Sequence, residues 1–265
     1  MSEIALTEPF MEMRWIFMKK ILSKEDIQHR CRQIPELLYP RHCPFCDGLL
    51  KDDEPYLCRS CAKKIKFISG PVCMKCGRPL DSDTAEYCDS CRRKEHRYIQ
   101  GFAPFIYRGM AQASIMKFKY GERAEYARFY AEAILRYGRR KIRDWDIGAV
   151  IPVPVHPLRY CARGYNQAQV LAEELAGKLG VPELGYLVRR VRNTKPQKGL
   201  TPSGRRKNLH GAFRVDEGVT FPENVLLVDD IYTTGTTIDE LASVVADHGA
   251  KNIWFVCVTI APGMT

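Results

Sequence analysis

The stretch V-L-L-V-D-D-I-Y-T-T-G-T-T, residues 225–237, does most to decide the fold. It begins with a continuous apolar run, which is typical of a strand buried on both faces of a parallel sheet. Two adjacent acids, Asp229 and Asp230, follow the run, and a hydroxyl-rich turn around Gly235 leads into a segment with helical spacing of apolar residues. This order of strand, turn and helix predicts one βα unit of a parallel sheet.

The segments on either side of this unit continue the alternation. Strands are expected at the short apolar runs 101–107, 147–155, 225–228 and 253–260. Helices are expected at 114–137 with a break at Gly121, at 166–179 ending at Gly180, and at 236–248 ending at Gly249. The pattern predicts a doubly wound α/β domain with helices on both faces of a parallel sheet, in which ligands lie at the carboxyl ends of the strands.

Composition limits the class of protein. The 265 residues are 45% hydrophobic and 27% charged, which excludes a fibrous or mostly disordered chain. The formal net charge of +10 favours phosphates or nucleic acid as partners. Glu12 and Arg14 interrupt the apolar patch at residues 10–18, and the uncharged run at 252–265 is shorter than the roughly 20 residues of a membrane span. We therefore expect a cytoplasmic protein with no membrane span.

Eight of the eleven cysteines form four C-x-x-C pairs, and successive pairs begin 15 residues apart. In a reducing compartment this spacing favours zinc, because two thiolates two residues apart can bind one ion from a single turn. Disulfides or a redox pair of the thioredoxin kind are the alternatives. Neighbouring pairs are expected to share two structural zinc ions: Cys43, Cys46, Cys58 and Cys61 bind the first, and Cys73, Cys76, Cys88 and Cys91 bind the second.

The remaining three cysteines, Cys31, Cys161 and Cys257, have no partner at ligand spacing. Burial as small apolar residues is expected for them, with a reactive nucleophile as the alternative.

The turn after the paired acids suits a phosphorylated sugar. Its backbone amides and the positive end of the helix dipole can hold a phosphate, which Gly235 allows to approach closely. Further donors are the hydroxyl groups of Thr233, Thr234, Thr236 and Thr237. Asp229 and Asp230 would repel a phosphate, so ribose hydroxyls or hydrated magnesium are their natural partners. The alternative is an ordinary strand-turn-helix in which the aspartates cap backbone amides.

Two further segments fit an anionic ligand. His156, Arg159 and Arg163 follow the strand at 147–155, where arginines can bind phosphate oxygens through paired donors. Residues 189–214 contain nine Lys or Arg residues and no acid, Lys198 and Arg205 among them. Such a run is either a solvated face or a mobile loop that closes over an anion.

Taken together, these features resemble the ComF family. The resemblance rests on five motifs: L-L-Y-P-R-H-C-P-F-C from residue 37, M-K-F-K-Y-G at 116–121, R-G-Y-N-Q at 163–167, T-K-P-Q at 194–197, and the stretch 225–237, which resembles the signature of type I phosphoribosyltransferases. The implied organisation is a poorly determined leader at 1–39, a double zinc ribbon at 40–96 and a type I phosphoribosyltransferase-like domain at 99–265.

The resemblance also implies a function. It implies binding of 5-phosphoribosyl-1-pyrophosphate (PRPP) with magnesium, transfer of phosphoribosyl to an unidentified acceptor, and a role in natural competence with single-stranded DNA and competence-machinery proteins as partners. By position, Asp229 and Asp230 would contact the ribose as catalytic residues, residues 233–237 would hold the 5-phosphate, and the segment after Val155 would meet the pyrophosphate. The segment from T-K-P-Q at 194–197 to Arg205 and Asn208 resembles the flexible loop of glutamine PRPP amidotransferase.

A non-catalytic alternative is an adaptor that senses PRPP and holds single-stranded DNA on the zinc ribbons and the basic run. The bases of the DNA would stack on Tyr56, Phe67, Tyr87 and Tyr98. The alternative is that these rings form the cores of the ribbons. Type I enzymes also cover the site with a hood. Because only five residues follow Ile260, we expect a cover from the zinc module or from residues 114–137.

Overall fold

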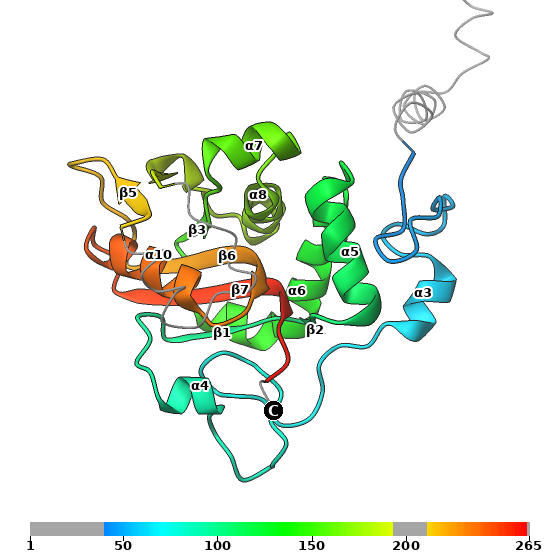
Figure 1. The fold of residues 1–265 in the computed structure, drawn as a ribbon, viewed down its shortest axis with the longest axis horizontal. Helices are drawn as coiled ribbons and strands as arrows, with labels where there is room; N and C mark the ends of the chain where they lie inside the picture. Colours follow the sequence, from blue (N-terminus) through cyan, green and yellow to red (C-terminus); the bar gives the residue numbers. More distant parts are fainter. Residues whose placement is uncertain (1–39, 193–210, 264–265) are drawn as a thin grey trace, which may run out of the picture. The chain divides into compact units, whose positions relative to one another are not determined.

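The computed structural model describes residues 40–192 and 211–263. Every helix and strand described below belongs to the compact unit Cys43–Thr265 (Figure 1). The expected leader at 1–39 lies outside the described residues.

Five strands form one sheet in which every pairing is parallel. The strands are β1 (Gln100–Phe102), β2 (Phe105–Ile106), β3 (Ala149–Pro152), β6 (Asn224–Tyr232) and β7 (Asn252–Ile260). Their order is β1-β7-β6-β3, and β2 also pairs with β7. The single strand expected at 101–107 is divided in two at Ala103 and Pro104, since proline has no N–H to donate.

Helices connect the strands as the alternation predicts. They are α5 (Gly109–Tyr120), α6 (Tyr126–Asp144), α7 (Pro157–Arg163), α8 (Gln167–Leu179) and α10 (Thr236–Ala246). The expected break at Gly121 is confirmed, because it separates α5 from α6. Helix α8 begins where Asn166 accepts a hydrogen bond from the N–H of Ala168, and it ends at Gly180 in the left-handed conformation.

Smaller elements complete the described chain. Each ribbon has one short helix, α3 (Arg59–Lys64) in the first and α4 (Asp89–Arg92) in the second. A 3-10 turn, η1 (Gly185–Leu187), leads into the antiparallel pair β4 (Val188–Arg190) and β5 (Phe213–Val215).

Helices cover both faces of the sheet, which confirms the predicted fold class. On one face, Leu226 and Val228 of β6 pack in a core with α5, α6 and α8. On the other face, Val225 and Leu227 pack in a core with α10. The first ribbon contributes to the former core through Phe45 and two of its cysteines, and the second ribbon contributes to the latter through three. Each face therefore carries one ribbon.

Across 40–192 and 211–263, the structure contains no helix that is both long and apolar enough to cross a bilayer.

Candidate functional site

The paired aspartates lie near the end of β6, inside the strand rather than after it. The strand continues to Tyr232 because Asp229, Ile231 and Tyr232 pair in register with β7. The predicted strand at 225–228 was therefore too short. Backbone pairing with a neighbouring strand outweighs the low strand propensity of aspartate, and it fixes both carboxyl groups at the carboxyl end of the sheet.

The two carboxyl groups lie close to each other, because, besides burial, the charge and the side chain of Asp230 both act to raise the pKa of Asp229. Asp230 is buried, and its carboxylate meets a lysine of α5.

Lys119, at the end of α5, forms an ion pair with Asp230 in which Nζ lies 2.7 Å from Oδ2. The lysine side chain is 17% exposed and the aspartate 9%. Burial acts to lower the pKa of Lys119, but the charge and hydrogen bond of Asp230, with the charge of Asp229, outweigh it and raise the pKa. Lys119 therefore stays protonated although its side chain is mostly buried.

Lys119 was not among the predicted site residues, although the sequence carries a signal for it. The buried face of α5 includes Ala111, Ile115 and Phe118. Lys119 follows Ile115 by four positions, which places it on the same stripe of the helix. A lysine in an apolar stripe needs a buried acid as a partner.

Asp229 has an unusual protonation equilibrium. Burial and the negative charge of Asp230 raise its pKa to about 7, although the charge of Lys119 acts in the opposite direction. Its Oδ1 also accepts a hydrogen bond of 2.8 Å from the N–H of Asp230. A carboxyl group that titrates near neutral pH beside a buried ion pair is typical of functional sites.

The threonine loop, residues 233–237, joins β6 to α10. Gly235 has a φ of 74°, and a Cβ atom there would lie 2.4 Å from the hydroxyl oxygen of Tyr232, so no other residue fits. The hydroxyl oxygens of Thr234 and Thr236 lie 2.9 Å apart. Helix α10 begins at Thr236 as predicted, so the positive end of its dipole lies at the loop.

The segment between β3 and α8 contains α7, a helix that was not predicted from the sequence. His156 caps this helix, since its Nδ1 accepts a hydrogen bond of 3.3 Å from the N–H of Leu158. Pro157 occupies the first helical position, where a missing N–H costs nothing. The structure thus gives the predicted ligand His156 a capping contact.

The predicted ligand Arg163 lies at the end of α7 beside α5. Its guanidinium carbon is 5.0 Å from the centre of the Tyr120 ring, and its nitrogens donate to the Tyr120 hydroxyl at 3.2 Å and to Gln167 at 2.9 Å. Burial, followed by the charge of Arg163, lowers the pKa of Arg159. Because Tyr120 follows Lys119, both arginines are near the end of α5 that holds the ion pair.

Arg190, on β4, adds another buried cation. It is 8% exposed, and its guanidinium carbon lies 5.6 Å from the centre of the Phe213 ring. Burial, followed by the charge of Arg159, lowers the pKa of Arg190 to about 10, while Asp229 acts to raise it. Part of the basic run is therefore buried rather than solvated. Two predicted ligands of the run lie outside the described residues: Lys198 and Arg205.

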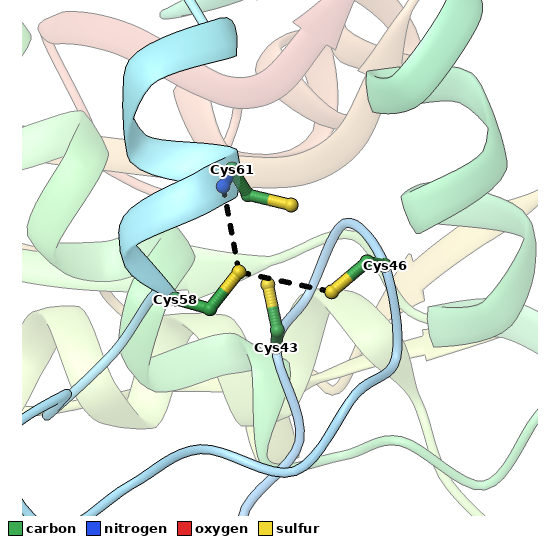
Figure 2. Close-up of side chains that lie close together, drawn as sticks. All are labelled: Cys43, Cys46, Cys58 and Cys61. Carbon is green, nitrogen blue, oxygen red and sulfur yellow. Dashed lines mark hydrogen bonds between the residues drawn. The ribbon is translucent and has the colours of Figure 1, made fainter.

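The eight paired cysteines form the two predicted tetrads, and within each the sulfur atoms lie within 4.8 Å of one another. Figure 2 shows the first tetrad, in which Cys43 and Cys46 on a turn face Cys58 and Cys61 at the start of α3. Zinc–sulfur bonds of about 2.3 Å in a tetrahedron place sulfurs about 3.8 Å apart. Cys46 and Cys58 are 3.8 Å apart, and Cys76 and Cys88 are 3.7 Å apart. The tetrads fit two structural zinc ions.

The solitary cysteines divide. Cys257 is buried in β7, as expected, whereas Cys161 is exposed on α7 and the expectation of burial was wrong. Cys161 lies on a short helix, and no residue of α7 is buried. Cys31 lies outside the described residues.

The second ribbon contacts the threonine loop. The guanidinium group of Arg78 donates a hydrogen bond to the carbonyl oxygen of Thr233. His96, which follows the second tetrad, lies 2.9 Å from a carboxylate oxygen of Asp239 in the first turn of α10. With Lys119 on the other side, the zinc module and residues 114–137 both bring side chains to the site.

Two domain families match the chain. The double zinc ribbon domain matches residues 34–92, and the phosphoribosyl transferase domain matches residues 166–263. Competence protein F of Haemophilus influenzae is 33% identical over 216 residues, which cover 80% of this chain and 93% of that protein.

More distant relatives align over similar lengths. Competence protein ComFC of Streptococcus pneumoniae is 28% identical over 211 residues, covering 77% of this chain and 88% of that protein. DNA utilization protein YhgH of Escherichia coli K12 is 26% identical over 229 residues, covering 84% and 100%. A purine phosphoribosyltransferase structure from Pyrococcus horikoshii has a TM-score of 0.29 and 15% identity, covering 52% of this chain and 92% of its own, a likeness too weak to carry an argument.

Proposed function

The chain belongs to the ComF family, and from this premise we propose that it binds PRPP with magnesium and transfers the phosphoribosyl group to an acceptor nucleophile. One observation carries the proposal. The carboxyl end of β6 holds Asp229 beside the ion pair of Asp230 and Lys119, and it leads directly into the threonine loop. Acids for a ribose and amides for a phosphate thus follow each other along a few residues of chain.

The threonine loop and the two aspartates would bind different groups of PRPP. The backbone amides at the start of α10 and the threonine hydroxyls would hold the 5-phosphate. The ribose hydroxyls would donate hydrogen bonds to Asp229 and Asp230. Lys119 compensates the charge of Asp230, which makes two adjacent acids tolerable at this strand end.

Transfer needs charge stabilisation rather than a covalent nucleophile on the protein. The bond between ribose C1 and a pyrophosphate oxygen breaks, and its electron pair leaves with pyrophosphate. The acceptor forms the new bond to C1 and loses a proton to solvent. Asp229 and Asp230 would lie beside the positive charge that develops on the ribose, while Arg159 and Arg163 would bind pyrophosphate. Magnesium would arrive with the donor and add positive charge to its phosphates.

Calorimetric titration with magnesium PRPP tests this assignment. The double variant Asp229→Asn with Asp230→Asn should bind on the order of a hundredfold more weakly, since two hydrogen bonds to charged groups are lost. Asp216→Asn is the matched control, because that carboxylate is exposed and pairs only with exposed Arg189 among the described contacts. Unchanged affinity in the double variant would refute the assignment, and pyrophosphate release with candidate acceptors then tests turnover.

A non-catalytic adaptor that binds PRPP and nucleic acid is the second candidate. The ribbon aromatics do not favour it, since Tyr98 is buried and Phe67 stacks on Phe105 at 5.4 Å. The specific observation in its favour lies on α5 and α7, where Tyr120 is 63% exposed and Tyr160 49% exposed near cationic arginines. Exposed rings and arginines together suit single-stranded nucleic acid.

The names of the relatives suggest the cellular process in which this second candidate function would act. We propose a role in natural competence and DNA utilization, in a reducing cytoplasm that prevents disulfides within the tetrads, with single-stranded DNA and competence proteins as partners. Single-stranded DNA should bind more weakly as salt rises, because phosphate contacts release counterions. If the affinity for single-stranded DNA does not change with salt concentration, or if PRPP turns over without DNA, the enzymatic function alone would be favoured.

A further inference from the structure

The turn that carries Cys73 and Cys76, called the metal turn below, lies directly against β1, the edge strand of the sheet. The N–H of Gly101 in β1 donates a hydrogen bond of 2.9 Å to the carbonyl oxygen of Lys75, between two zinc ligands in the sequence. Gly77 has a φ of 73°, and a Cβ atom there would lie 2.8 Å from Cα of Phe102. The turn therefore sits against β1 with no room for a side chain between them.

Arg78 extends from this turn to the threonine loop. The N–H of Cys73 donates to the carbonyl oxygen of Arg78 at 2.7 Å, which closes the turn around the metal position. The Arg78 side chain then donates to the carbonyl oxygen of Thr233. The residue is 7% exposed, and within the described chain its buried Nε has no hydrogen-bond partner. A charged group is thus buried in order to hold one backbone position of the loop.

The exit from the second ribbon holds the other end of the loop. Lys94 and His96 both contact the carboxylate of Asp239, in the first turn of α10. The Tyr98 hydroxyl lies 2.6 Å from the hydroxyl of Tyr232, the residue before the loop. Arg78 within the second tetrad and the residues that follow the tetrad therefore hold both ends of the threonine loop.

We propose that the second tetrad and the threonine loop form one linked unit, in which Arg78 is the positioning residue. A zinc ribbon folds only with its metal, so the metal decides whether Arg78 is held in place. Loss of the second metal ion should release the loop. Because linkage is reciprocal, a ligand that binds the loop should also slow loss of that metal ion. This last consequence alone rests on the proposed function.

Hydrogen exchange tests the structural part without any ligand. In the zinc-loaded full chain, Arg78→Met should speed amide exchange about tenfold in peptides covering residues 233–240, the effect of losing one charged hydrogen bond. Arg78→Lys keeps the charge and should give a smaller increase. Arg123→Met is the matched control, since Arg123 contacts Asp47 of the first ribbon and its loss should leave these peptides unchanged. Equal exchange in Arg78→Met and wild type would overturn the proposal.

Zinc extraction decides the matter even where a variant fails to fold. A chelator removes zinc from the wild-type chain while alkylation and mass spectrometry report which tetrad is exposed. Exchange in residues 233–240 should speed up with alkylation of the second tetrad and not with the first. A loop that stays protected after the second tetrad is alkylated would refute the linkage.

Adding PRPP separates this inference from the proposed function. The donor should slow alkylation of the second tetrad about tenfold and leave the first unchanged. Calorimetric binding without selective protection would overturn the linkage. Absent calorimetric binding would instead refute the proposed function, and the exchange result without ligand would still decide the linkage.

Discussion

The two zinc ribbons have the same ligands at the same spacing, yet they are attached to the domain in different ways. The first packs apolar surface, with Phe45 edge-on to Phe105 and Phe129 at ring distances of 5.9 and 5.4 Å. The second uses polar contacts to reach the threonine loop, through Arg78 and His96. Their difference teaches that the function of a structural metal unit is set by its flanking residues and not by its ligands.

Removing one ligand from each tetrad should separate the ribbons most strongly. Cys76→Ser and Cys46→Ser are each expected to lower the zinc content from two ions per chain to one. Only Cys76→Ser should weaken PRPP binding, on the order of a hundredfold, because the loop loses its positioning contacts at both ends. Elemental analysis measures the zinc, and calorimetry measures the affinity.

Circular dichroism serves as the control for this pair, since the sheet and the large helices should survive in both variants. Equal loss of donor affinity in the two variants would mean that the ribbons are interchangeable supports, and the comparison would fail.

The carboxylates that attach the ribbons give a smaller and more selective contrast. Asp239→Asn removes the partner of Lys94 and His96, and it should weaken PRPP binding about tenfold with both zinc ions retained. Asp47→Asn removes the partner of Arg123 and Tyr126, and it should leave PRPP affinity unchanged. Calorimetry measures the PRPP affinity of both variants. An equal loss of affinity in the two would contradict the comparison.

Asp47→Asn should instead cost stability. Burial acts to raise the pKa of Asp47, but hydrogen bonds from Arg123 and Tyr126 outweigh it and lower the pKa from 3.8 to about 2. The carboxylate therefore contributes about 2 kcal/mol that is present above pH 3.8 and is lost as pH falls through 2. Denaturant unfolding at neutral pH should show a loss of that order, and an unchanged midpoint would count against the contact.

The smallest expected effect is on the pH dependence of Asp229. A raised pKa of about 7 means that ionisation costs stability in the empty protein, so stability should fall as pH rises from 3.8 towards 7. If the proposed function holds, PRPP with magnesium would favour the ionised form, and its affinity should rise about threefold between pH 6.5 and 7.5. Asp229→Asn should flatten the stability profile, and a profile that keeps its slope would assign the titration elsewhere.

Much of the fold could be predicted because its signals are local. The break at Gly121, the cap at Asn166 and the end of α8 at Gly180 each depend on a single residue acting on its neighbours. The zinc tetrads were equally predictable, because the spacing of C-x-x-C pairs reflects the geometry of one turn. Helix α7 was missed because its first residue is proline, which indicates a turn as readily as a helix start.

The site was only half predictable, since its remaining contacts are distant in the sequence. Asp229 and Asp230 were found from their place after an apolar run, but Lys119 comes from a helix before β3. Arg78 reaches Thr233 across 155 residues, and no local pattern distinguishes it from the other arginines of the chain. Such partners follow from how the sheet faces are covered, which periodicity alone does not determine.

The contact between the metal turn and β1 affects how readily the chain self-associates. Strand β1 is an outer strand of the sheet, and the metal turn covers it by accepting the N–H of Gly101. Outer strands with open backbone groups pair with strands of other molecules and begin aggregates. A chain stripped of its second zinc ion should therefore self-associate along β1, so metal supply would govern its colloidal state as well as its chemistry.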